Sequence, residues 1–338
     1  ESSSHCKLIK FRSPIVTNTD LGKIRNLDQE QFSHVVLPML FEANKPNPGE
    51  TLHKAIEELC KKAEDAVDQG RNFIILSDRG ISESLAPIPS LLAVSAVHHH
   101  LINTQKRMQI GLIVETAEPR EVNHFALLFA FGASVVNPYC SFAIIEKMCE
   151  TGQIKDDYVT AREHYIKAID KGLLKVMSKM GISTLRSYHG AQIFEAIGLS
   201  KDVADTYFTG TDSRIGGIGL DEIAQETLMQ HRMAFSPDNQ EGLVPTTQGV
   251  YHYRKNGEQH AWNPETIGLL QWATRTNDYA KFKEFTSMVN EQNRKPLFIR
   301  GCINLKKSNP VPLEEVEPVE SIMKRFVTGA MSFGSISK

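Results

Sequence analysis

Short apolar runs alternate with longer helical patterns along most of the chain, and this alternation constrains the fold more than any other feature. Runs rich in Val, Ile and Leu, each ending in polar or turn residues, fall at 34–41, 72–80, 109–119 and 133–139. Consecutive apolar residues are typical of parallel strands that are covered on both faces. The segments between the runs are long enough for right-handed helical crossovers, so the pattern predicts a parallel sheet.

The connecting segments have the periodicity of amphipathic helices. Their apolar residues recur every three to four positions, as expected of helices with one buried face. Gly70 and Gly132 follow two of these segments and favour helix ends, whereas Pro119 favours a helix start. We predict helices over 52–69, 90–106, 120–131, 141–150 and 157–180.

The stretch 171–223 continues the alternation and carries many of the polar loop residues. We expect it to contain a fifth strand over the Gly-Ile-Ser-Thr-Leu run at 181–185 and a sixth strand at 207–213. In parallel α/β sheets, ligand sites lie at the carboxyl ends of the strands. These loops are therefore the first place to look for a functional site.

About six strand–helix units favour an α/β fold. We predict an incomplete or modified (β/α) barrel-like domain with parallel strands, and the alternative is an open doubly wound sheet. After residue 230 the alternation ends. Gly, Pro and alternating aromatic residues at 243–267 predict a short hairpin that turns at 255–257, and a helical stretch follows at 264–290.

The same features suggest a domain organisation. Residues 1–30 are polar with scattered apolar positions and are interpreted as an N-terminal arm, with a short helix at 27–32. Residues 31–300 are interpreted as a central α/β domain. Residues 301–338 contain several prolines and are interpreted as a connector that leads into a further strand.

Composition excludes several classes of function. The 338 residues have a formal net charge of −2, which argues against a nucleic-acid-binding or anionic-membrane-binding protein. No apolar run approaches the ~20 residues that a membrane span needs, and no signal peptide is visible. The odd number and the wide spacing of the cysteines disfavour a disulfide framework and a metal cluster. We therefore expect reduced thiols and a cytoplasmic protein. They are Cys6, Cys60, Cys140, Cys149 and Cys302.

Both ends of the sequence are unusual for a complete protein. The chain begins at Glu1 without an initiator Met, and it stops at Lys338 just after GAMSFGSIS, a strand-and-loop pattern with no helix after it. We expect that it is a piece of a larger protein.

Two motifs resemble ligand sites at first sight. His98, His99 and His100 are consecutive, but adjacent residues of a helix point about 100° apart and cannot converge on one metal ion. The run RIGGIG at 214–219 resembles a phosphate loop, yet its spacing fits neither GxGxxG nor a P-loop. We interpret it as a tight glycine turn, with an anion or partner contact through Arg214 as the alternative.

Charged residues follow two of the predicted strands. Asp78, Arg79 and Glu83 follow one, and Glu115 and Glu118 lie at the end of another. At the rim of a barrel such groups can act in acid–base catalysis. The chain shows no nucleophile–base pattern beside them, so we interpret them as structural ion pairs and loop caps.

Four long stretches, read together and in order, resemble one known family. They are ILSDRGISESLAPIPSLLAVSAVHHHLI, GLIVETAEPREVNHFALLFAFGASVVNPY, LLKVMSKMGISTLRSYHGAQIFEAIGL and FTGTDSRIGGIGLDEIA. They are similar to the central domain of glutamate synthase, whether of the large subunit of the pyridine-nucleotide-dependent enzyme or of the single ferredoxin-dependent chain. The resemblance spans roughly residues 20–338.

The resemblance implies a multidomain oxidoreductase. In that family an amidotransferase domain releases ammonia from glutamine, and an FMN-binding barrel that also needs an iron–sulfur cluster uses it with 2-oxoglutarate to form glutamate. The central domain joins the two and helps form the ammonia path. The implied partners are these two domains of the same polypeptide, with an electron-donating subunit or ferredoxin for the full enzyme.

Site residues follow from the resemblance as well. It implies no catalytic or metal-binding residue in this chain and no cofactor bound to it alone. The stretch 316–337 resembles the connecting loop and first strand of the FMN domain, which implies flavin contacts at Gly329, Ala330, Met331 and Ser332. Candidates for a domain interface or the ammonia path are the loop residues Tyr188, His189, Asp212, Ser213 and Arg214.

Two other functions remain open from the residues alone. One is a free-standing (β/α) enzyme that uses the carboxylates at its strand ends. The other is a regulatory metabolite-binding module, which has only the Gly-rich loop in its favour.

Overall fold

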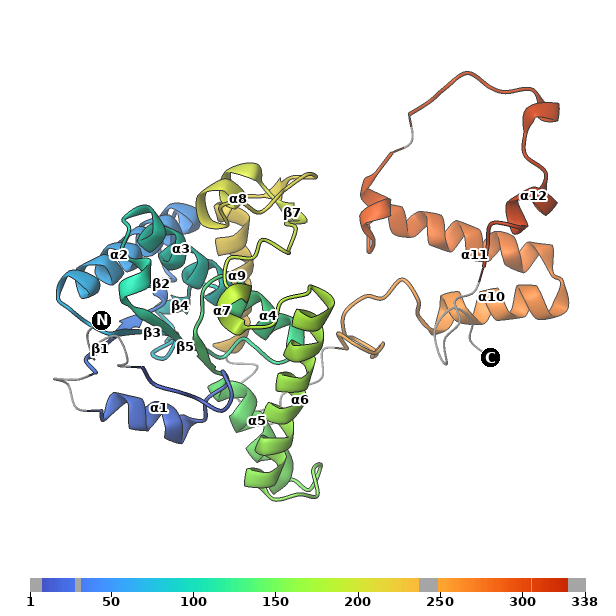
Figure 1. The fold of residues 1–338 in the computed structure, drawn as a ribbon. Helices are drawn as coiled ribbons and strands as arrows, with labels where there is room; N and C mark the ends of the chain where they lie inside the picture. Colours follow the sequence, from blue (N-terminus) through green and yellow to red (C-terminus); the bar gives the residue numbers. More distant parts are fainter. Residues whose placement is uncertain (1–7, 28–31, 237–248, 305, 328–338) are drawn as a thin grey trace. The chain divides into compact units, whose positions relative to one another are not determined.

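The computed structural model of this protein describes residues 8–27, 32–236, 249–304 and 306–327. The chain forms two compact units, unit 1 (residues 1–242) and unit 2 (residues 243–338), and each is described by itself (Figure 1). The predicted boundaries after residues 30 and 300 stay a prediction.

Unit 1 is built on a four-stranded parallel sheet. Its strands are β1 (His34–Pro38), β3 (Phe73–Ser77), β5 (Gly111–Glu115) and β6 (Val135–Asn137), in the order β1-β3-β5-β6. All neighbouring pairs are parallel, so the four carboxyl ends meet at one edge. All four apolar runs predicted as strands are confirmed.

The strand order distinguishes the two predicted architectures. Each strand of this sheet lies beside the one that precedes it in the parallel series, as in a (β/α) barrel, and the order does not reverse among the described strands as it does in a doubly wound sheet. Among the described strands the sheet does not close on itself. The predicted α/β fold with an incomplete barrel-like sheet is therefore confirmed.

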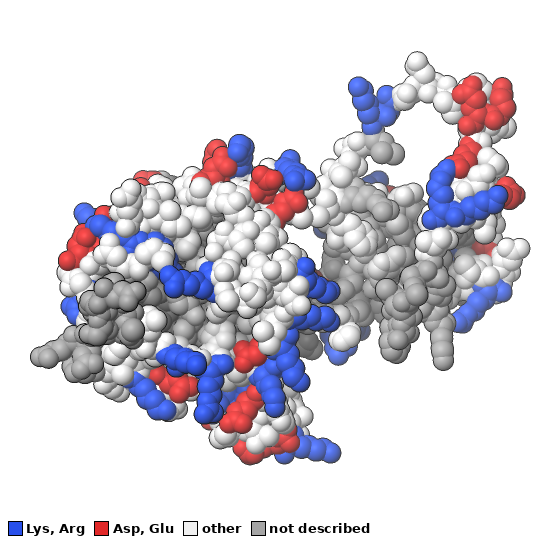
Figure 2. All heavy atoms as spheres, in the orientation of Figure 1, with Lys and Arg blue, Asp and Glu red and all other residues white. Residues whose placement is uncertain are grey.

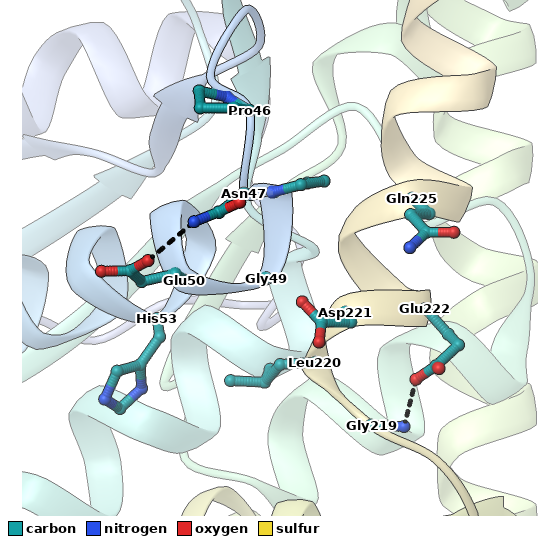
Figure 3. A pocket seen from close by; sticks show the side chains of 11 residues that line it. Pro46, Asn47, Gly49, Glu50, His53, Gly219, Leu220, Asp221, Glu222 and Gln225 are labelled. Carbon is teal, nitrogen blue, oxygen red and sulfur yellow. Dashed lines mark hydrogen bonds between the residues drawn. The ribbon is translucent and has the colours of Figure 1, made fainter.

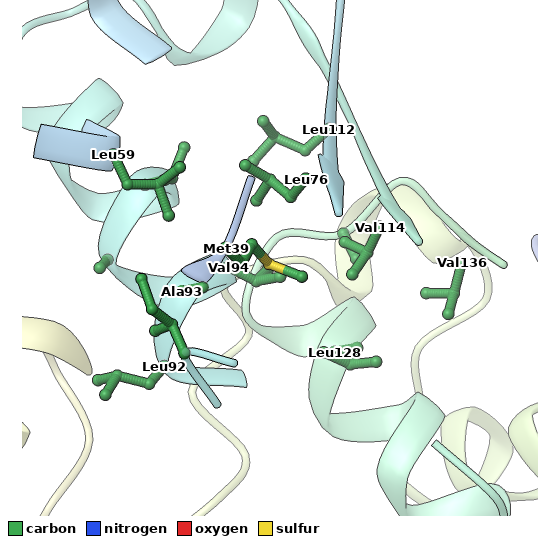
Figure 4. Packing of buried hydrophobic residues seen from close by; sticks show 14 of the residues in the cluster. Met39, Leu59, Leu76, Leu92, Ala93, Val94, Leu112, Val114, Leu128 and Val136 are labelled. Atoms are coloured by element: carbon green, nitrogen blue, oxygen red, sulfur yellow. The ribbon is translucent and has the colours of Figure 1, made fainter. Parts of the chain in front are cut away.

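Three helices cover one face of the sheet. They are α2 (Pro48–Asp68), α3 (Ser90–Asn103) and α4 (Val122–Ala130), close to their predicted ranges. Every second strand residue points toward them, because side chains alternate between the two faces of a sheet. Figure 4 shows part of this core, which includes Met39, Leu59, Leu76, Leu92, Leu112, Val114 and Leu128.

The N-terminal segment covers the other face. The helix α1 (Asn18–Arg25), which Thr17 caps, packs on the strand residues whose side chains point to this other face. The segment before α1 also extends the sheet edge, since the amide of Val16 donates to the carbonyl of Val136 at 2.9 Å. A second, smaller apolar cluster results, formed by Val16, Leu21, Ile24, Ile75, Ile113 and Val135.

Two further helices complete the regular part of unit 1. They are α5 (Tyr139–Glu150) and α6 (Tyr158–Lys179), and both match predicted helices. The first predicted strand is divided, because β1 is followed by β2 (Leu40–Glu42), which pairs antiparallel with β4 (Leu85–Pro87). The sequence pattern did not indicate this small hairpin-like pair.

The fifth and sixth predicted strands are wrong. Residues 182–184 have no regular structure, because the Thr184 side chain accepts a hydrogen bond from the amide of Ser187 and starts the short helix α7 (Leu185–Tyr188). Tyr207 ends the helix α8 (Lys201–Tyr207), and a loop follows it. The parallel pairing in this region is limited to β7 (Gly198–Leu199) and β8 (Gly217–Ile218). The last helix of unit 1 is α9 (Leu220–Ala234).

Unit 2 contains two helices packed against each other, α10 (Pro264–Thr276) and α11 (Tyr279–Glu291). The single helical stretch predicted at 264–290 is broken, because Asn277 adopts a left-handed conformation at φ 54°. The predicted hairpin is wrong over the described residues 249–263, which contain no strand. Its turn exists, since the amide of Gly257 donates to the carbonyl of Arg254 at 2.9 Å.

The remaining elements are short. They are the 3-10 helices Arg107–Gln109, Gln292–Arg294, Ile299–Cys302 and Leu313–Glu315, and the helix α12 (Val319–Met323). Within the described ranges, no helix has the length and apolar character to cross a bilayer. Free thiols are found, as predicted, at Cys60, Cys140, Cys149 and Cys302. Cys6 lies outside the described residues, and so do residues 28–31 of the helix predicted at 27–32.

Candidate functional site

The carboxyl edge of the sheet gathers the charged residues that the sequence places at strand ends. Glu115, at the end of β5, is the centre of the group, and its side chain is 2% exposed. It accepts hydrogen bonds from Ser77 Oγ at 2.6 Å, from Arg79 Nε at 2.7 Å and from Arg25 at 2.8 Å. Arg25 comes from α1, so the N-terminal segment completes the network.

These contacts set the ionisation of Glu115. Burial by itself would raise the pKa of its carboxyl group. The hydrogen bonds from Ser77 and Arg79 and the positive charges of Arg25 and Arg79 outweigh burial, so the pKa lies below its ordinary value. Glu115 is therefore a carboxylate held by cations, which makes it a poor proton donor or acceptor at neutral pH.

Asp78 forms a second cluster at the same edge. It accepts hydrogen bonds from Thr116 Oγ1 at 2.6 Å, from the amide of Ala117 at 2.8 Å and from the Tyr139 hydroxyl at 2.8 Å. The Arg79 guanidinium lies 3.9 Å from the centre of the Tyr139 ring, a cation–π contact. Burial, followed by the nearby charge of Asp78, raises the pKa of Tyr139.

Other polar groups close the rest of this edge. Asn137, fully buried at the end of β6, donates to the carbonyl of Val16 at 2.9 Å and to Asn18 Oδ1 at 3.0 Å. Glu118 accepts from the amide of Ser90 at 2.9 Å at the start of α3. The interpretation as ion pairs and loop caps is confirmed for Asp78, Arg79, Glu115 and Glu118, whereas Glu83 is exposed.

The three consecutive histidines of α3 differ in burial, since His98 is buried whereas His99 and His100 are half-buried. His98 Nδ1 accepts a hydrogen bond from Arg107 Nε at 2.8 Å, and burial lowers the pKa of His98 to about 3. His100 Nε2 lies 2.9 Å from Glu64 on α2. No group of three or more His, Cys, Asp or Glu residues in the described part of the chain could hold a metal ion.

The predicted interface residues fall into two separate groups. Tyr188 is fully buried at the end of α7, and neither its hydroxyl nor His189 Nε2 has a hydrogen-bond partner among the described residues. Burial lowers the pKa of His189 to about 4, so this imidazole is neutral at physiological pH.

The second group lies in the loop between α8 and β8. Ser213 Oγ donates to the carbonyl of Leu199 at 2.6 Å, and the amide of Ala196 donates to the carbonyl of Asp212 at 2.8 Å. Arg214 is mostly exposed and forms ion pairs with Glu195 at 3.3 Å and with Asp212 at 3.5 Å. This group is accessible at the surface, unlike Tyr188.

The Gly-rich loop at 214–219 is a tight backbone contact. Gly217 pairs with Gly198 at φ 152°, and a Cβ atom there would lie 2.0 Å from the Gly198 carbonyl oxygen. The amide of Gly219 donates to Glu222 of its own helix at 2.8 Å. These contacts use the glycines and the amide for the turn itself.

A hollow of about 620 Å³ lies between the amino ends of α2 and α9 (Figure 3). The two helices meet closely, because a Cβ on Gly49 would lie 1.8 Å from a carboxylate oxygen of Asp221. Glu50, Asp221 and Glu222 line the hollow together with His53. Carboxylates at helix amino ends compensate the helix dipoles, so this lining disfavours a phosphate-bearing ligand.

Cofactor residues cannot be placed on this framework. The predicted flavin contacts Gly329, Ala330, Met331 and Ser332 lie outside the described residues. The four described thiols are dispersed and do not fit an iron–sulfur cluster, and the acidic hollow does not fit the phosphate of FMN.

Sequence reasoning missed the partners that connect these groups. Ser77 and Tyr139 are ordinary strand-end and helix-start residues, and Arg25 lies ninety positions from Glu115. The only available signal was the rule that carboxyl ends of neighbouring parallel strands meet, which puts Ser77 beside Glu115 but does not indicate Arg25.

The fold and this edge define an α/β domain of barrel-like strand order whose strand-end charges are paired with one another. The chain belongs to the glutamate synthase family. The family model described as "Glutamate synthase central domain" matches residues 1–200, and the one described as "Conserved region in glutamate synthase" matches residues 260–338.

Curated relatives agree over the full length of this chain. The large chain of glutamate synthase (NADPH) from Bacillus subtilis is 43% identical over 100% of this chain and 22% of its own length. Glutamate synthase (NADH) from Schizosaccharomyces pombe is 36% identical over 99% of this chain and 16% of its own length. Ferredoxin-dependent glutamate synthase from Cyanidium caldarium is 38% identical over 100% of this chain and 22% of its own length. The chain thus spans about a fifth of the length of these relatives.

Solved structures show only a distant likeness. A mutant flavocytochrome b2 with benzoylformate has a TM-score of 0.31 and 17% identity over 41% of this chain and 37% of that one. A mutant mandelate oxidase with a monooxide FMN adduct has a TM-score of 0.32 and 13% identity over 56% of this chain and 65% of that one. At such scores the likeness supports no conclusion about fold or function.

Proposed function

We propose that this chain is the central domain of a glutamate synthase, an oxidoreductase that forms glutamate from glutamine and 2-oxoglutarate. In this proposal it joins the glutamine amidotransferase domain to the FMN-binding synthase domain and helps to form the path for ammonia between them. FMN and an iron–sulfur cluster belong to the full-length enzyme, and the chemistry takes place outside these 338 residues. The proposed location is the cytoplasm.

The paired charges at the carboxyl edge of the sheet carry this proposal. In a barrel enzyme this edge is where catalytic groups face the substrate. Here Glu115 is held by two arginines and a serine, and Asp78 is held by three donors. A rim in which the buried carboxylates bond to their own domain supports a structural role better than a catalytic one, so the free-standing enzyme is disfavoured.

An ammonia path also has a physical requirement that suits a rigid domain. Ammonia is protonated in neutral water and is then no longer a nucleophile, so the path must exclude bulk water. The surface loop with Asp212, Ser213 and Arg214 is held to β7 by the hydrogen bond from Ser213 to Leu199, and to the residues just before β7 by a hydrogen bond from Ala196 and an ion pair with Glu195. It is the part of the candidate group that can contact another domain. We assign it to the domain interface in this proposal.

The test uses a full-length glutamate synthase that contains this chain. Asp212→Ala, Ser213→Ala and Arg214→Ala are combined, and glutamate formation is measured with glutamine and, separately, with added ammonium as the nitrogen source. We expect a lower rate with glutamine, more ammonia released per glutamate formed, and an unchanged rate with ammonium.

Control substitutions lie on the exposed faces of other helices. Lys61→Ala on α2 and Glu163→Ala on α6 change exposed charged residues that are distant from this loop in the sequence. Both should leave the two rates and the ammonia release as in the unmodified enzyme. Full channelling in the triple variant would refute the role of the loop.

A further inference from the structure

Three polar side chains form a row at the carboxyl edge of the sheet, on the face that α1 covers. Ser77, Glu115 and Asn137 are the last residues of β3, β5 and β6, and they are neighbours in the register of these strands. Register partners of parallel strands point to the same face. The strand residues two positions earlier pack with Leu21 and Ile24 of α1, so the row lies at the end of that apolar cluster. We call these three residues the polar row.

The polar row is closed off from bulk solvent. Figure 2 shows charged side chains of both signs over the part of unit 1 where α1 lies, so the outer side of this helix is polar. Beneath it, Asn137 is 0% exposed and the side chain of Glu115 is 2% exposed. A polar atom in such a place needs a hydrogen-bond partner inside the protein, because bulk water does not reach it.

The side-chain amide of Asn137 has partners on one side. Its Nδ2 donates both hydrogens, to the carbonyl of Val16 at 2.9 Å and to Asn18 Oδ1 at 3.0 Å. Its Oδ1 is buried and accepts no hydrogen bond from the described residues. Exchanging the two atoms would place Oδ1 against the Val16 carbonyl, which cannot donate. The orientation of the amide is therefore fixed, and the group that lacks a donor is Asn137 Oδ1.

Donors at the same edge serve Glu115 instead. Its Oε2 accepts hydrogen bonds from Ser77 Oγ and from Arg25. Its Oε1 accepts one among the described residues, from Arg79 Nε, and a carboxylate oxygen has lone pairs for a further bond. Adjacent strands lie about 4.8 Å apart, and this separation suits one small molecule that donates to an acceptor on each strand. Asn137 Oδ1 and Glu115 Oε1 are two such acceptors.

The surrounding charges favour a neutral molecule at this position. Two arginines contact the single carboxylate of Glu115, so a cation such as ammonium would meet net positive charge. An anion would be repelled by both acceptor oxygens. Burial restricts the size to that of water, and Asn137 is not among the residues that line the hollow of about 620 Å³. The chemistry that fits is a neutral, water-sized donor of two or more hydrogen bonds.

We infer that one such molecule, water or ammonia, binds between Asn137 Oδ1 and Glu115 Oε1 and donates a hydrogen bond to each. It joins β5 to β6 and holds the amide that fixes Val16 and Asn18, so it contributes to the attachment of the N-terminal segment. A buried water site does not depend on the proposed ammonia path, whereas ammonia as the occupant would rest on it.

The other fully buried side chain without a partner lies in a different environment. The Tyr188 hydroxyl has no partner among the described residues, but Tyr188 belongs to the main apolar cluster. A buried water needs two to four polar partners, and apolar cavities stay dry. The bound molecule is therefore expected at Asn137 and not at Tyr188.

The experiment is nuclear magnetic resonance on the 338-residue chain with isotope-labelled asparagine in a deuterated background. Contacts between water and the side-chain amide protons are measured as NOE and as ROE. A long-lived bound water gives the two effects with opposite sign, whereas chemical exchange gives them with the same sign. We expect opposite signs at Asn137, and Asn137→Ser assigns these signals by removing them. Asn26 is the internal control, because its exposed amide donates to the carbonyl of Gly22 and should show no long-lived water.

Two substitutions test the second acceptor. In Glu115→Gln the amide oxygen is expected to stay with Arg25 and Ser77, which leaves its nitrogen in the place of Oε1. This nitrogen can donate directly to Asn137 Oδ1, so the water contact should be lost while the Asn137 signals remain. Ser77→Ala is the matched control, since it removes a donor to Oε2 and leaves Oε1 unchanged. It should keep the contact. Circular dichroism confirms that each variant is folded.

Ammonium chloride at alkaline pH, compared with potassium chloride at the same concentration, distinguishes the two occupants. A saturable shift of the Asn137 amide protons with loss of the water contact assigns ammonia, and an unchanged spectrum assigns water. Both results support the site. Three results would overturn it. They are no long-lived contact at Asn137, the same contact at the exposed Asn26, and a contact at Asn137 that persists in Glu115→Gln.

Discussion

The four-stranded sheet and the segment 181–219 have similar alternation in the sequence but are stabilised in different ways. The sheet is held by apolar side chains on both faces, and most of its residues are fully buried. In the segment, parallel pairing is limited to two residues on each strand, and the backbone takes left-handed conformations repeatedly. The residues with such φ values there are Gly181, Gly190, Gln192, Gly198, Gly210, Gly216 and Gly217.

This difference shows that the sequence pattern predicts a strand only where the strand is buried on both faces. Consecutive Val, Ile and Leu residues identify a strand because they need burial on two faces, whereas the segment offers only isolated apolar residues among glycines and polar groups. Strand–loop–helix alternation without consecutive apolar residues therefore does not predict a strand of the sheet. In this protein the candidate interface loop lies in such a segment.

The largest expected effect comes from the same kind of deletion made in both regions. Leu112→Ala removes a fully buried side chain of β5 and should lower the free energy of unfolding by about 2–5 kcal/mol, because a cavity is left in a packed core. Ile197→Ala removes a side chain that is 57% exposed beside β7 and should change it by less than about 0.5 kcal/mol. Urea denaturation of the 338-residue chain measures both values. Similar losses would mean that the two regions are equally packed.

A smaller effect is expected at the paired carboxylate. Glu115→Gln should lower the free energy of unfolding by about 1.5–3 kcal/mol at neutral pH, because three donors, two of them charged, lose a carboxylate acceptor. Since the pKa of Glu115 is lowered on folding, its charge stabilises the fold above the ordinary value of 4.5 and ceases to do so as pH falls through the lowered pKa.

The measurement is the urea midpoint of the unmodified chain and of Glu115→Gln from neutral to acid pH. Their difference should be constant above pH 4.5 and shrink below it. Taking the difference cancels other titrations, including that of His98, whose buried imidazole resists protonation. A difference that stays the same at the lowest pH would contradict the assigned role of the ion pairs.

How far the sequence alone leads can be judged from these two residues. Leu112 belongs to a run whose burial the pattern predicts, and the parallel order then places Glu115 beside Ser77. Arg25 is beyond such reasoning, because its contact depends on how α1 docks on the sheet, and nothing local in its sequence encodes that. The same holds for Gly49 and Asp221, which approach only because two distant helices meet.

The failures in the irregular segment have a local cause. Thr184 and Ser200 are helix caps, and each accepts a hydrogen bond from the amide three residues later. These caps start helices at Leu185 and Lys201, so the chain cannot continue as a strand beyond them. Reading Thr184 as a cap rather than as a β-branched strand residue would have corrected the fifth strand.

Gly217 and Gly216 allow the cost of a steric clash to be distinguished from the cost of a positive φ angle. Gly217→Ala should destabilise unit 1 by about 1–3 kcal/mol, since the added Cβ would meet the Gly198 carbonyl and part the two short strands. Gly216→Ala has the same need for positive φ but no atom within 4 Å, so only the conformational cost of about 1–2 kcal/mol applies. Hydrogen exchange of the Ser200 amide, which donates to the carbonyl of Ile218, detects the local change. Faster exchange in Gly216→Ala than in Gly217→Ala would contradict the tight contact.

The smallest effect is expected from removing one hydroxyl group. The Tyr188 hydroxyl is buried without a partner among the described residues, so Tyr188→Phe should leave the free energy of unfolding unchanged or raise it by up to about 1 kcal/mol. Tyr207→Phe is the matched control, because its hydroxyl lies 2.7 Å from His53 Nδ1 and its loss should cost about 1 kcal/mol. A clear loss of stability in Tyr188→Phe would show that the hydroxyl is bound after all, and would make this buried position, rather than the exposed loop at Arg214, the better candidate for contact with a small polar molecule.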